Sequence, residues 1–372
     1  MIQLSRMALI VATIAGLVAA HGFAHAQETK APTKKEVQVV LDKAIKYLRS
    51  SQEEQGGFSS RRFGPGVTAL VVAGLLQNGV SEDDPMVTKA LKYMESNVQE
   101  NGGIYSKFLA NYTTSVAVMA FKEADTKGKY DALLKNAAKF LKKLLHDQPE
   151  SLSKDVEFGG FGYDKGSRPD MSNTAFTVEA LLAAGVSKDD PAIKKALVFL
   201  SRSQNLPSEK NDQVFAKKAT KDDKGGFVYT PVNPKKSGDR TAVGGLRSVG
   251  AMTYNGLKSF LYAGVSKKDK RVKAAMRWIK RHYTLKENPG VGKAGLFYYY
   301  HTFAKTMTAL GNEVFVDADK KKHYWKRELF EAIKSQQLPN GSWVNRGDRR
   351  FGEAMPDLAT AFAILSLSYT GK

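Results

Sequence analysis

The sequence predicts an all-α protein whose helical hairpins close into a double ring, an (α/α)6 toroid. The first observation is a glycine-rich turn, ending in an aromatic or apolar residue, that occurs six times. The turns are Gln55-Gly56-Gly57-Phe58, Asn101-Gly102-Gly103-Ile104, Phe158-Gly159-Gly160-Phe161, Lys224-Gly225-Gly226-Phe227, Lys293-Ala294-Gly295-Leu296 and Asn340-Gly341-Ser342-Trp343. The second observation is that each turn is followed by an apolar helix rich in small residues. Because one hairpin cannot bury its own apolar face, the units must stack.

Each repeat contains two kinds of predicted helix. In the segment 272–281 the apolar residues fall on one face, at Val272, Ala275, Met276 and Ile279. The segments 67–76 and 359–365 are instead apolar on nearly every side. A helix without a polar face is buried all round, so these segments predict an inner ring surrounded by an amphipathic outer ring.

The ends of the helices also follow from the residues. Asp84 and Asp190 each precede a proline at the first position of an outer helix. We expect these aspartates to cap the helices rather than to bind a metal. The inner helices are expected to end at glycines that accept the left-handed conformation, namely Gly79, Gly185, Gly264 and Gly311.

The N-terminal residues predict export. Arg6 precedes an apolar run at 7–20, and Ala24-His25-Ala26 supplies the small residues that a signal peptidase requires. We therefore predict a signal peptide at 1–26, a linker at 27–36, a single repeat domain at 37–372, and a periplasmic or secreted location. The alternative is an uncleaved anchor, but the run is shorter than the about twenty residues that span a membrane. No stable transmembrane helix is expected after cleavage.

Composition excludes several kinds of site. The chain has no cysteine, so it forms no disulfide, thioester or thiolate metal site. We expect neither a metal nor a cofactor. The formal net charge is +20, and removal of Arg6 with the signal peptide leaves +20 − 1 = +19. This charge favours an acidic envelope polymer as a partner, or simply a solvated lysine-rich surface, whereas nucleic acid is an unlikely partner for an exported chain without a binding module.

The repeat resembles a known superfamily. The string Gln336-Gln337-Leu338-Pro339-Asn340-Gly341-Ser342-Trp343 is similar to the Gln-Trp repeat of squalene and hopene cyclases. The alternation of turns and inner helices resembles the α/α-toroid superfamily over residues 37–369. That superfamily also includes the β subunits of protein prenyltransferases and the thioester domains of complement-like proteins. The resemblance implies a terpenoid cyclase/protein prenyltransferase-like toroid.

The catalytic groups of these relatives are missing. The cyclases protonate an alkene with the middle aspartate of an Asp-x-Asp-Asp-Thr-Ala motif, and the matching string here is Asp170-Met171-Ser172-Asn173-Thr174-Ala175. Ser172 stands where the proton donor is expected, and a hydroxyl cannot supply that acid. The zinc site of the prenyltransferases requires a cysteine. The resemblance therefore implies neither activity in its usual form.

Candidate site residues lie in the loops before the inner helices, which we expect to open at one end of the ring. The candidates for ligand binding are Tyr112, Tyr163, Arg168, Asp170, Arg240, Arg247, Tyr299, His301, Arg350 and Asp357. The same loops carry Tyr229, Tyr298 and Glu353. The run Tyr298-Tyr299-Tyr300 points in three directions from a helix, so at least one of its rings is expected in the core.

Four of the candidates carry groups that can catalyse: His301, Asp170, Asp357 and Tyr299. Each also has a structural interpretation, as a hydrogen-bonded histidine in the ring or as an aspartate that caps a helix or pairs with an arginine. Three functions stay open. They are a binder of an apolar, isoprenoid-like or glycan ligand in the central cavity, a terpenoid- or polysaccharide-processing enzyme with an atypical site, and a basic envelope scaffold.

Overall fold

A computed structural model describes residues 31–147, 155–232, 240–348 and 350–371. The predicted signal peptide at 1–26 lies outside these residues, as does the first part of the predicted linker. None of the helices in the described ranges is long and apolar enough to cross a membrane.

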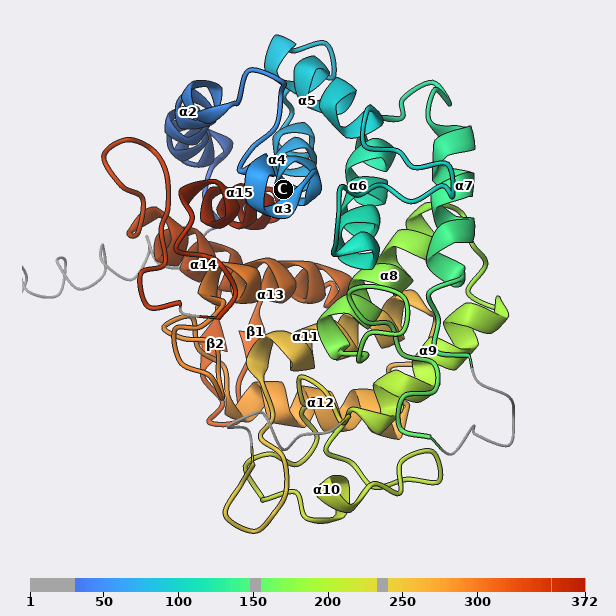
Figure 1. The fold of residues 1–372 in the computed structure, drawn as a ribbon. Coiled ribbons are helices and arrows are strands. Elements are labelled where there is room, and N and C mark those ends of the chain that lie inside the picture. The colour runs from blue at the N-terminus through green and yellow to red at the C-terminus, as the bar shows by residue number, and fades with distance from the viewer. Residues whose placement is uncertain (1–30, 148–154, 233–239, 349, 372) are drawn as a thin grey trace, which may run out of the picture.

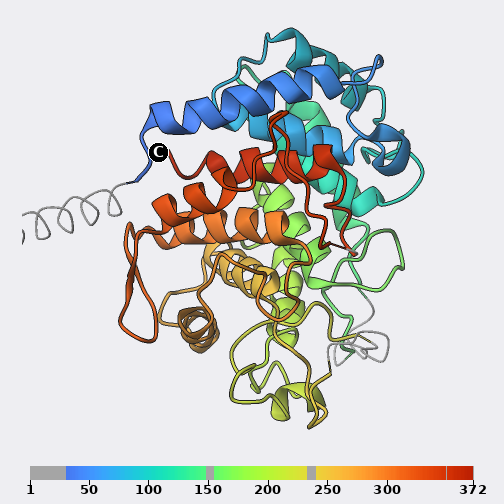
Figure 2. The same cartoon turned by 90° about the vertical axis from the view of Figure 1, so that its left-hand side faces the viewer.

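The described helices form two concentric layers (Figures 1 and 2). The inner layer consists of α4 (Gly66–Gln77), α6 (Ala110–Ala124), α8 (Met171–Ala183), α11 (Gly250–Tyr262), α13 (Leu296–Leu310) and α15 (Pro356–Leu367). The outer layer consists of α2 (Lys34–Ser51), α5 (Pro85–Glu95), α7 (Asp131–Lys142), α9 (Pro191–Arg202), α12 (Lys270–Arg281) and α14 (Trp325–Lys334). Two short helices, α3 (Ser60–Phe63) and α10 (Val214–Lys217), lie in loops. The strands β1 (Phe315–Val316) and β2 (Lys322–His323) form a small antiparallel ribbon.

The inner layer is a closed ring. Each inner helix packs against the next one along the chain, and α15 packs against α4. The outer helix of each hairpin packs on its own inner helix, except that α2, from the N-terminal end, packs on α15. Residues far apart in the sequence therefore close the ring: Gln337 donates a 2.9 Å hydrogen bond to the carbonyl of Val40, and Arg327 pairs with Glu36 at 2.7 Å. This arrangement is the double ring that the sequence predicts.

Burial of the inner helices explains their composition. Nearly every side chain of α4 and α15 is buried, whereas the outer helices bury one face. Small residues permit close packing between neighbours, because a Cβ added at Gly74 of α4 would lie 2.6 Å from the side chain of Ile364 in α15. The prediction of helices that are apolar all round is confirmed.

Five of the six predicted glycine turns join one repeat to the next, whereas the sixth, at 293–296, is the start of α13, with Gly295 as its N-cap. The first glycine of the turn has a positive φ and lies against a carbonyl of the outer helix of the neighbouring repeat. This holds for Gly56, Gly102, Gly159, Gly225 and Gly341. The aromatic or apolar residue that ends the turn donates its backbone N–H to a threonine hydroxyl of the inner helix. These bonds measure 2.9 to 3.1 Å at Thr68, Thr114, Thr174, Thr253 and Thr360. The recurring sequence thus encodes a recurring contact between repeats.

The predicted helix ends are found in the structure. Asp84 and Asp190 each accept a 2.9 Å hydrogen bond from the second residue of their outer helix, so both aspartates are caps. The first outer helix begins at Lys34, within the segment predicted as linker, because Thr33 and Glu36 form a capping box.

We predict that the glycine turn tolerates no side chain at Gly159. Gly159 has φ 83° and Gly185 has φ 82°, but a Cβ at Gly159 would overlap the carbonyl oxygen of Lys195, whereas Gly185 faces open space. Gly185→Ala should cost about 1 kcal/mol of unfolding free energy, the ordinary cost of an alanine in the left-handed region. Gly159→Ala should cost at least about 2 kcal/mol more. Urea unfolding measures both, and equal losses would contradict the packing role.

Candidate functional site

The N-termini of the inner helices meet at one end of the ring because the next repeat supplies their caps. The backbone N–H groups of Asn111, Met171 and Gly250 donate to the carbonyls of Tyr163, Tyr229 and Pro289 at 2.8 to 2.9 Å. Side chains of the next repeat cap α6, α11 and α13: Asp164 accepts from Ala110 at 2.8 Å, Asn288 from Ala251 at 2.9 Å and Glu353 from Tyr298 at 2.7 Å. The loops before α8, α11, α13 and α15 are therefore held over the starts of α6, α8, α11 and α13.

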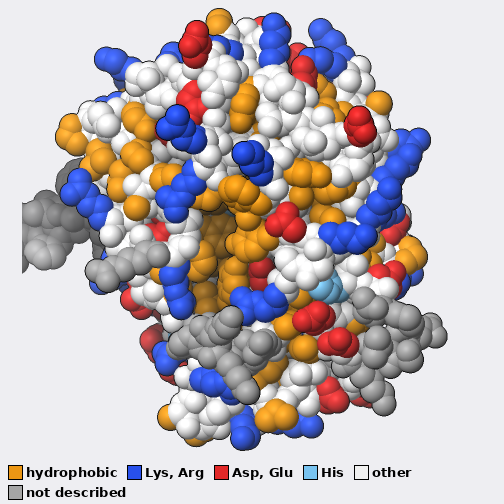
Figure 3. Space-filling model, in the orientation of Figure 1, with side chains coloured by type: hydrophobic (Ala, Val, Ile, Leu, Met, Phe, Trp, Pro, Cys, Tyr) orange, Lys and Arg blue, Asp and Glu red, His pale blue; other side chains and the backbone are white. Residues whose placement is uncertain are grey.

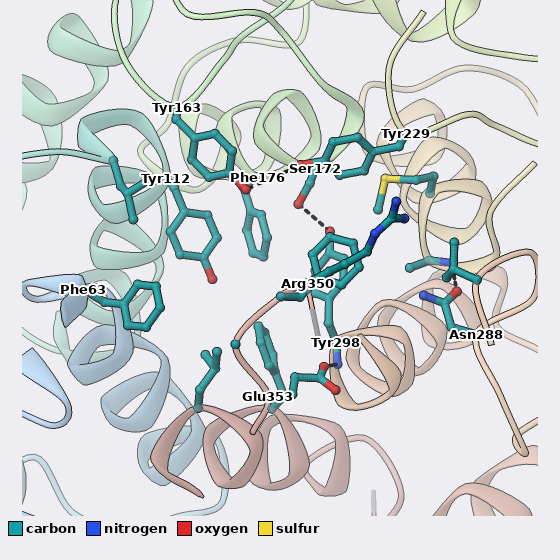
Figure 4. Close-up of a pocket in the computed structure, with 18 of the residues that line it drawn as sticks. Phe63, Tyr112, Tyr163, Ser172, Phe176, Tyr229, Asn288, Tyr298, Arg350 and Glu353 are labelled. Carbon is teal, nitrogen blue, oxygen red and sulfur yellow. Dashed lines mark hydrogen bonds between the residues drawn. The ribbon is translucent and has the colours of Figure 1, made fainter. Parts of the chain in front are cut away.

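A cavity of about 480 Å³ lies at this end of the ring (Figures 3 and 4). The loops contribute Arg62, Phe63, Leu109, Tyr163, Arg168, Tyr229, Val249, Asn288, Val291, Arg350, Phe351, Gly352 and Glu353. The inner helices contribute Val67, Tyr112, Ser172, Phe176, Ala251, Met252, Tyr298, Leu358 and Phe362. Figure 3 shows the hollow, with hydrophobic side chains inside it and basic side chains at its edge.

Aromatic rings in contact with one another line the wall. Tyr112 meets Phe176 edge-on with ring centres 5.3 Å apart, and Phe176 stacks on Tyr298 at 6.0 Å. Tyr298 in turn lies 5.5 Å from Phe362. These rings come from four different inner helices, so the closure of the ring assembles the wall. Such a wall offers apolar surface and π faces to a ligand.

The position that matches the acid of the cyclases lies in this cavity. Ser172 is in the first turn of α8, and its Oγ hydrogen-bonds the hydroxyl of Tyr298 at 2.8 Å. Asn255 also donates to that hydroxyl, at 2.5 Å. Burial raises the pKa of Tyr298 above its ordinary value, so the hydroxyl stays protonated. The site is therefore the one occupied by a proton donor in the family motif, but it holds two neutral hydroxyls.

One carboxyl group lines the cavity among the described residues, that of Glu353 (Figure 4). It accepts hydrogen bonds from the backbone N–H groups of Tyr298 at 2.7 Å and Phe297 at 3.2 Å, and from the Asn345 amide at 2.7 Å. The side chain is fully buried, and burial raises the pKa of Glu353 to about 7. Both protonation states of this carboxyl are therefore populated near neutral pH.

Four of the ten candidates from the sequence line this cavity: Tyr112, Tyr163, Arg168 and Arg350. Asp170 lies behind the wall, where it accepts bonds from the backbone and side-chain amides of Asn173 as the cap of α8. Burial raises the pKa of Asp170 to about 6. These hydrogen bonds fit the structural interpretation of Asp170, in which the carboxylate caps an inner helix.

The other candidates do not line the cavity. Arg240 and Arg247 are exposed on the long loop that follows α10. Tyr299 is buried and donates to the carbonyl of Thr284 at 2.7 Å. Asp357 accepts from the hydroxyls of Tyr47 at 2.8 Å and Ser59 at 2.7 Å, which ties α15 to α2 and to the loop before α4.

His301 belongs to a buried polar cluster deeper in the ring. Its ring lies 5.9 Å from that of Phe362, and its Nδ1 has no hydrogen-bond partner among the described residues. Burial, with a smaller contribution from the positive charge of Lys258, lowers the pKa of His301 to about 3. Next to it, Glu179 pairs with Lys258 at 2.5 Å and also with Lys305. His301 is thus a neutral imidazole that does not line the cavity.

Sequence reasoning missed Arg62, Phe176 and Phe362. The two phenylalanines lie inside apolar helices, where a cavity wall and a packed core have the same composition. Arg62 lies beside Arg61 and Phe63 in the segment before α4, and this combination of basic and aromatic residues before an inner helix could have singled it out.

Comparisons with known proteins agree with this geometry. A family model of the squalene-hopene cyclase C-terminal domain matches residues 64–222. The apo structure of the type II terpene cyclase MstE from Scytonema is similar with a TM-score of 0.52 and 16% identity, over 91% of this chain and 98% of that one. The chain has the terpenoid-cyclase α/α-toroid fold. The fold class and the superfamily resemblance predicted from the sequence are confirmed.

Two further solved structures are similar to this toroid. A protein from Actinoplanes has a TM-score of 0.48 at 14% identity, over 90% of this chain and 99% of that one. A complex of an MstE variant with its substrate, geranylgeranyl dihydroxybenzoate, has a TM-score of 0.32 at 14% identity, over 91% and 97%. A comparison with curated protein sequences finds no match. Within the described ranges, no group of three or more histidine, aspartate or glutamate residues could hold a metal ion.

We predict that His301 makes stability depend on pH. Its pKa is about 3 in the folded protein and about 6.5 in the unfolded chain. Between these values the unfolded chain binds more protons, so the contribution of this group to stability falls as the pH drops below about 6.5. From pH 7 to about pH 5, the wild type should lose about 2 kcal/mol more unfolding free energy than His301→Phe or His301→Gln. Equal losses in urea unfolding would show that His301 does not titrate in this way.

Proposed function

We propose that this toroid binds an elongated apolar, isoprenoid-like molecule in its central cavity. The observation that carries the proposal is the set of contacting aromatic rings, from Tyr112 through Phe176 and Tyr298 to Phe362, around a space of about 480 Å³. This volume lies within the range of small-molecule sites. Burial of a flexible apolar chain against such a wall is favoured by about 25 cal/mol per Å² of apolar surface.

The lining favours an apolar chain over a glycan. A sugar requires hydrogen-bonding groups spread along the wall, whereas the hydroxyls of Ser172 and Tyr298 bond to each other. The inner helices also contribute the apolar side chains of Phe176, Ala251 and Met252 to the lining. An apolar ligand leaves these existing bonds intact.

Localisation is part of the same proposal. The apolar run at 7–20 and the small residues of Ala24-His25-Ala26 support export, so the ligand would be met outside the cytoplasm. Water-insoluble isoprenoids in such a compartment require a protein cavity for transfer between membranes or for processing.

We predict that removing one ring of the wall weakens binding. Phe176→Ala deletes the ring that contacts both Tyr112 and Tyr298, and should weaken geranylgeraniol binding by about tenfold. Phe158→Ala is the matched control, because Phe158 lies against Lys195 and Arg202 on the outside of the ring. Displacement of a fluorescent apolar probe measures both affinities. Similar affinities for the two variants, or no binding by the wild type, would contradict the proposal.

Acid-initiated chemistry on the bound isoprenoid is the second candidate function. It is favoured by Glu353, the described carboxyl in the cavity lining, whose pKa of about 7 leaves a proton available at neutral pH. Transfer of that proton to an alkene carbon would break the O–H and π bonds and form a C–H bond and a carbocation, with the aromatic wall around it. Attack of a second alkene on the cation would close a ring, and loss of a proton to the Glu353 carboxylate or to water would give a neutral isomer. Hydrolysis of a polysaccharide is less well supported, because that chemistry needs two carboxyls flanking one bond.

We predict that this activity depends on Glu353 and not on Asp170. Incubation of the protein with geranylgeraniol should give cyclised isomers by mass-resolved gas chromatography, with a rate that falls as the pH rises above about 7. Glu353→Gln should abolish product while retaining ligand binding, and Asp170→Asn should retain product. Product formed by Glu353→Gln, or lost only in Asp170→Asn, would exclude Glu353 as the acid.

A further inference from the structure

We propose that Lys258, which lies below the central cavity, forms a Schiff base with an aldehyde at the end of the apolar chain that enters the ring. The proposal rests on the proposed function, because the cavity delivers the chain to the lysine. It names both the class of ligand, an apolar aldehyde, and the direction of binding: the reactive carbon enters first and lies deepest.

A buried charged pair repeats a contact of the cavity two helical turns deeper. Within the cavity, Ser172 of α8 hydrogen-bonds Tyr298 of α13. Seven residues further along the same two helices, Glu179 pairs with Lys305. Seven residues are about two turns, or about 10.5 Å, and bring the chain back to the same face of a helix. Glu179 and Lys305 therefore lie beneath the cavity, on the helix faces that line it.

Lys258 reaches the same carboxylate from the helix between them. It belongs to α11, which packs against both α8 and α13. Its Nζ lies 2.5 Å from a carboxylate oxygen of Glu179 and 6.0 Å from the ring centre of Tyr262, and only 2% of its surface is exposed. Three inner helices thus place two amines around one carboxylate in the interior of the ring.

The charges of this cluster favour one neutral amine. One carboxylate cannot balance two ammonium groups, and an uncompensated charge in the interior is costly. Burial lowers the pKa of Lys258 to about 7 and that of Lys305 to about 8. Lys258 therefore loses its proton first, and the neutral amine is the form that attacks a carbonyl carbon. An ordinary exposed lysine, with a pKa of about 10.4, is neutral in only about one molecule in 2500 at pH 7.

Phe362 and His301 connect the cavity to this lysine. Phe362 lines the cavity, and its ring centre lies 5.5 Å from that of Tyr298 and 5.9 Å from that of His301. His301 follows Tyr298 by three residues and precedes Lys305 by four, so it lies between the two levels of α13. It is near enough to Lys258 for the charge of that lysine to lower the pKa of His301. In the proposed reaction, rotation of the Phe362 ring gives the end of a bound chain access to Lys258.

The reaction replaces the carbonyl bond of the aldehyde by an imine bond. The Nζ of neutral Lys258 attacks the aldehyde carbon, and the C–N bond forms as the π electrons of the carbonyl move to oxygen. Both amine protons then leave with that oxygen as water, and the nitrogen lone pair completes the C=N bond. In its Nδ1–H tautomer, His301 can donate to the carbonyl oxygen, because its Nδ1 has no partner among the described residues. Glu179 stays paired with Lys305 throughout, so the cluster remains neutral.

The test uses two ligands with the same tail, geranylgeranial and geranylgeraniol. The full chain is incubated at pH 7 with one equivalent of the aldehyde and with sodium cyanoborohydride, which reduces an imine to a stable amine. Peptide mapping by mass spectrometry locates the adduct, and the loss of water in its mass distinguishes an imine from conjugate addition. Displacement of a fluorescent apolar probe measures the binding of geranylgeraniol separately.

Two variants accompany the wild type. Lys258→Met removes the nucleophile and leaves Glu179 paired with Lys305, so the charges of the cluster stay balanced. Lys139→Met is the matched control, because it removes an exposed lysine of the outer helix α7. Thermal unfolding checks that both variants are folded, and the peptide map of the wild type identifies the modified lysine without any substitution.

We expect at least about tenfold more adduct at Lys258 than at any other lysine of the wild type. This adduct should persist in Lys139→Met, be absent from Lys258→Met, and be suppressed by excess geranylgeraniol. Binding of geranylgeraniol without an adduct at Lys258 would overturn the Schiff base but leave the apolar site intact. An adduct that excess geranylgeraniol does not suppress would overturn delivery through the cavity. Failure of geranylgeraniol to bind would overturn the proposed function itself.

Discussion

The N-termini of the inner helices expose backbone N–H groups that a helix cannot satisfy, and the site depends on how the next repeat satisfies those of α6, α8, α11 and α13. Carbonyls of Tyr163, Tyr229 and Pro289, and side chains such as Asp164 and Glu353, accept these bonds. Each cap fixes a loop over the neighbouring helix. Four loops are therefore held at one end of the ring, where the helix starts also concentrate positive dipole ends.

The same constraint explains why the cavity exists. Inner helices packed side by side leave space at the centre of a ring, and residues from one helix alone cannot fill it. Large aromatic side chains of four helices meet there without closing it. The glycine turns hold the outer layer at a fixed distance, because the first glycine of the turn lies against a carbonyl of the next outer helix.

The repeats made the fold predictable, and the periodicity of apolar residues assigned helices to the two layers. The same pattern could not place individual side chains. In the run Tyr298-Tyr299-Tyr300, helical geometry sends one ring into the cavity, while Tyr299 and Tyr300 donate to the carbonyls of Thr284 and Leu285. The sequence could state that the three rings diverge, but not which of them would face the centre.

The protonation states of the titratable candidates were harder to predict than their positions, because burial determines the pKa of each group. His301 has a pKa near 3 because it lies in a desolvated interior next to Lys258, and Glu353 has a pKa near 7 because it lies in the aromatic wall. Both residues look alike in sequence, as polar residues near an inner helix. Arg240 and Arg247 were predicted to face the cavity from the loop before α11, but a loop of that length places them on the exterior.

The most direct test is a crystal structure of the protein grown with geranylgeraniol. The account predicts continuous electron density for the isoprenoid chain inside the ring, in contact with Phe176, Tyr298 and Phe362. Density for the ligand on the outer surface, with only ordered water among those three rings, would contradict it.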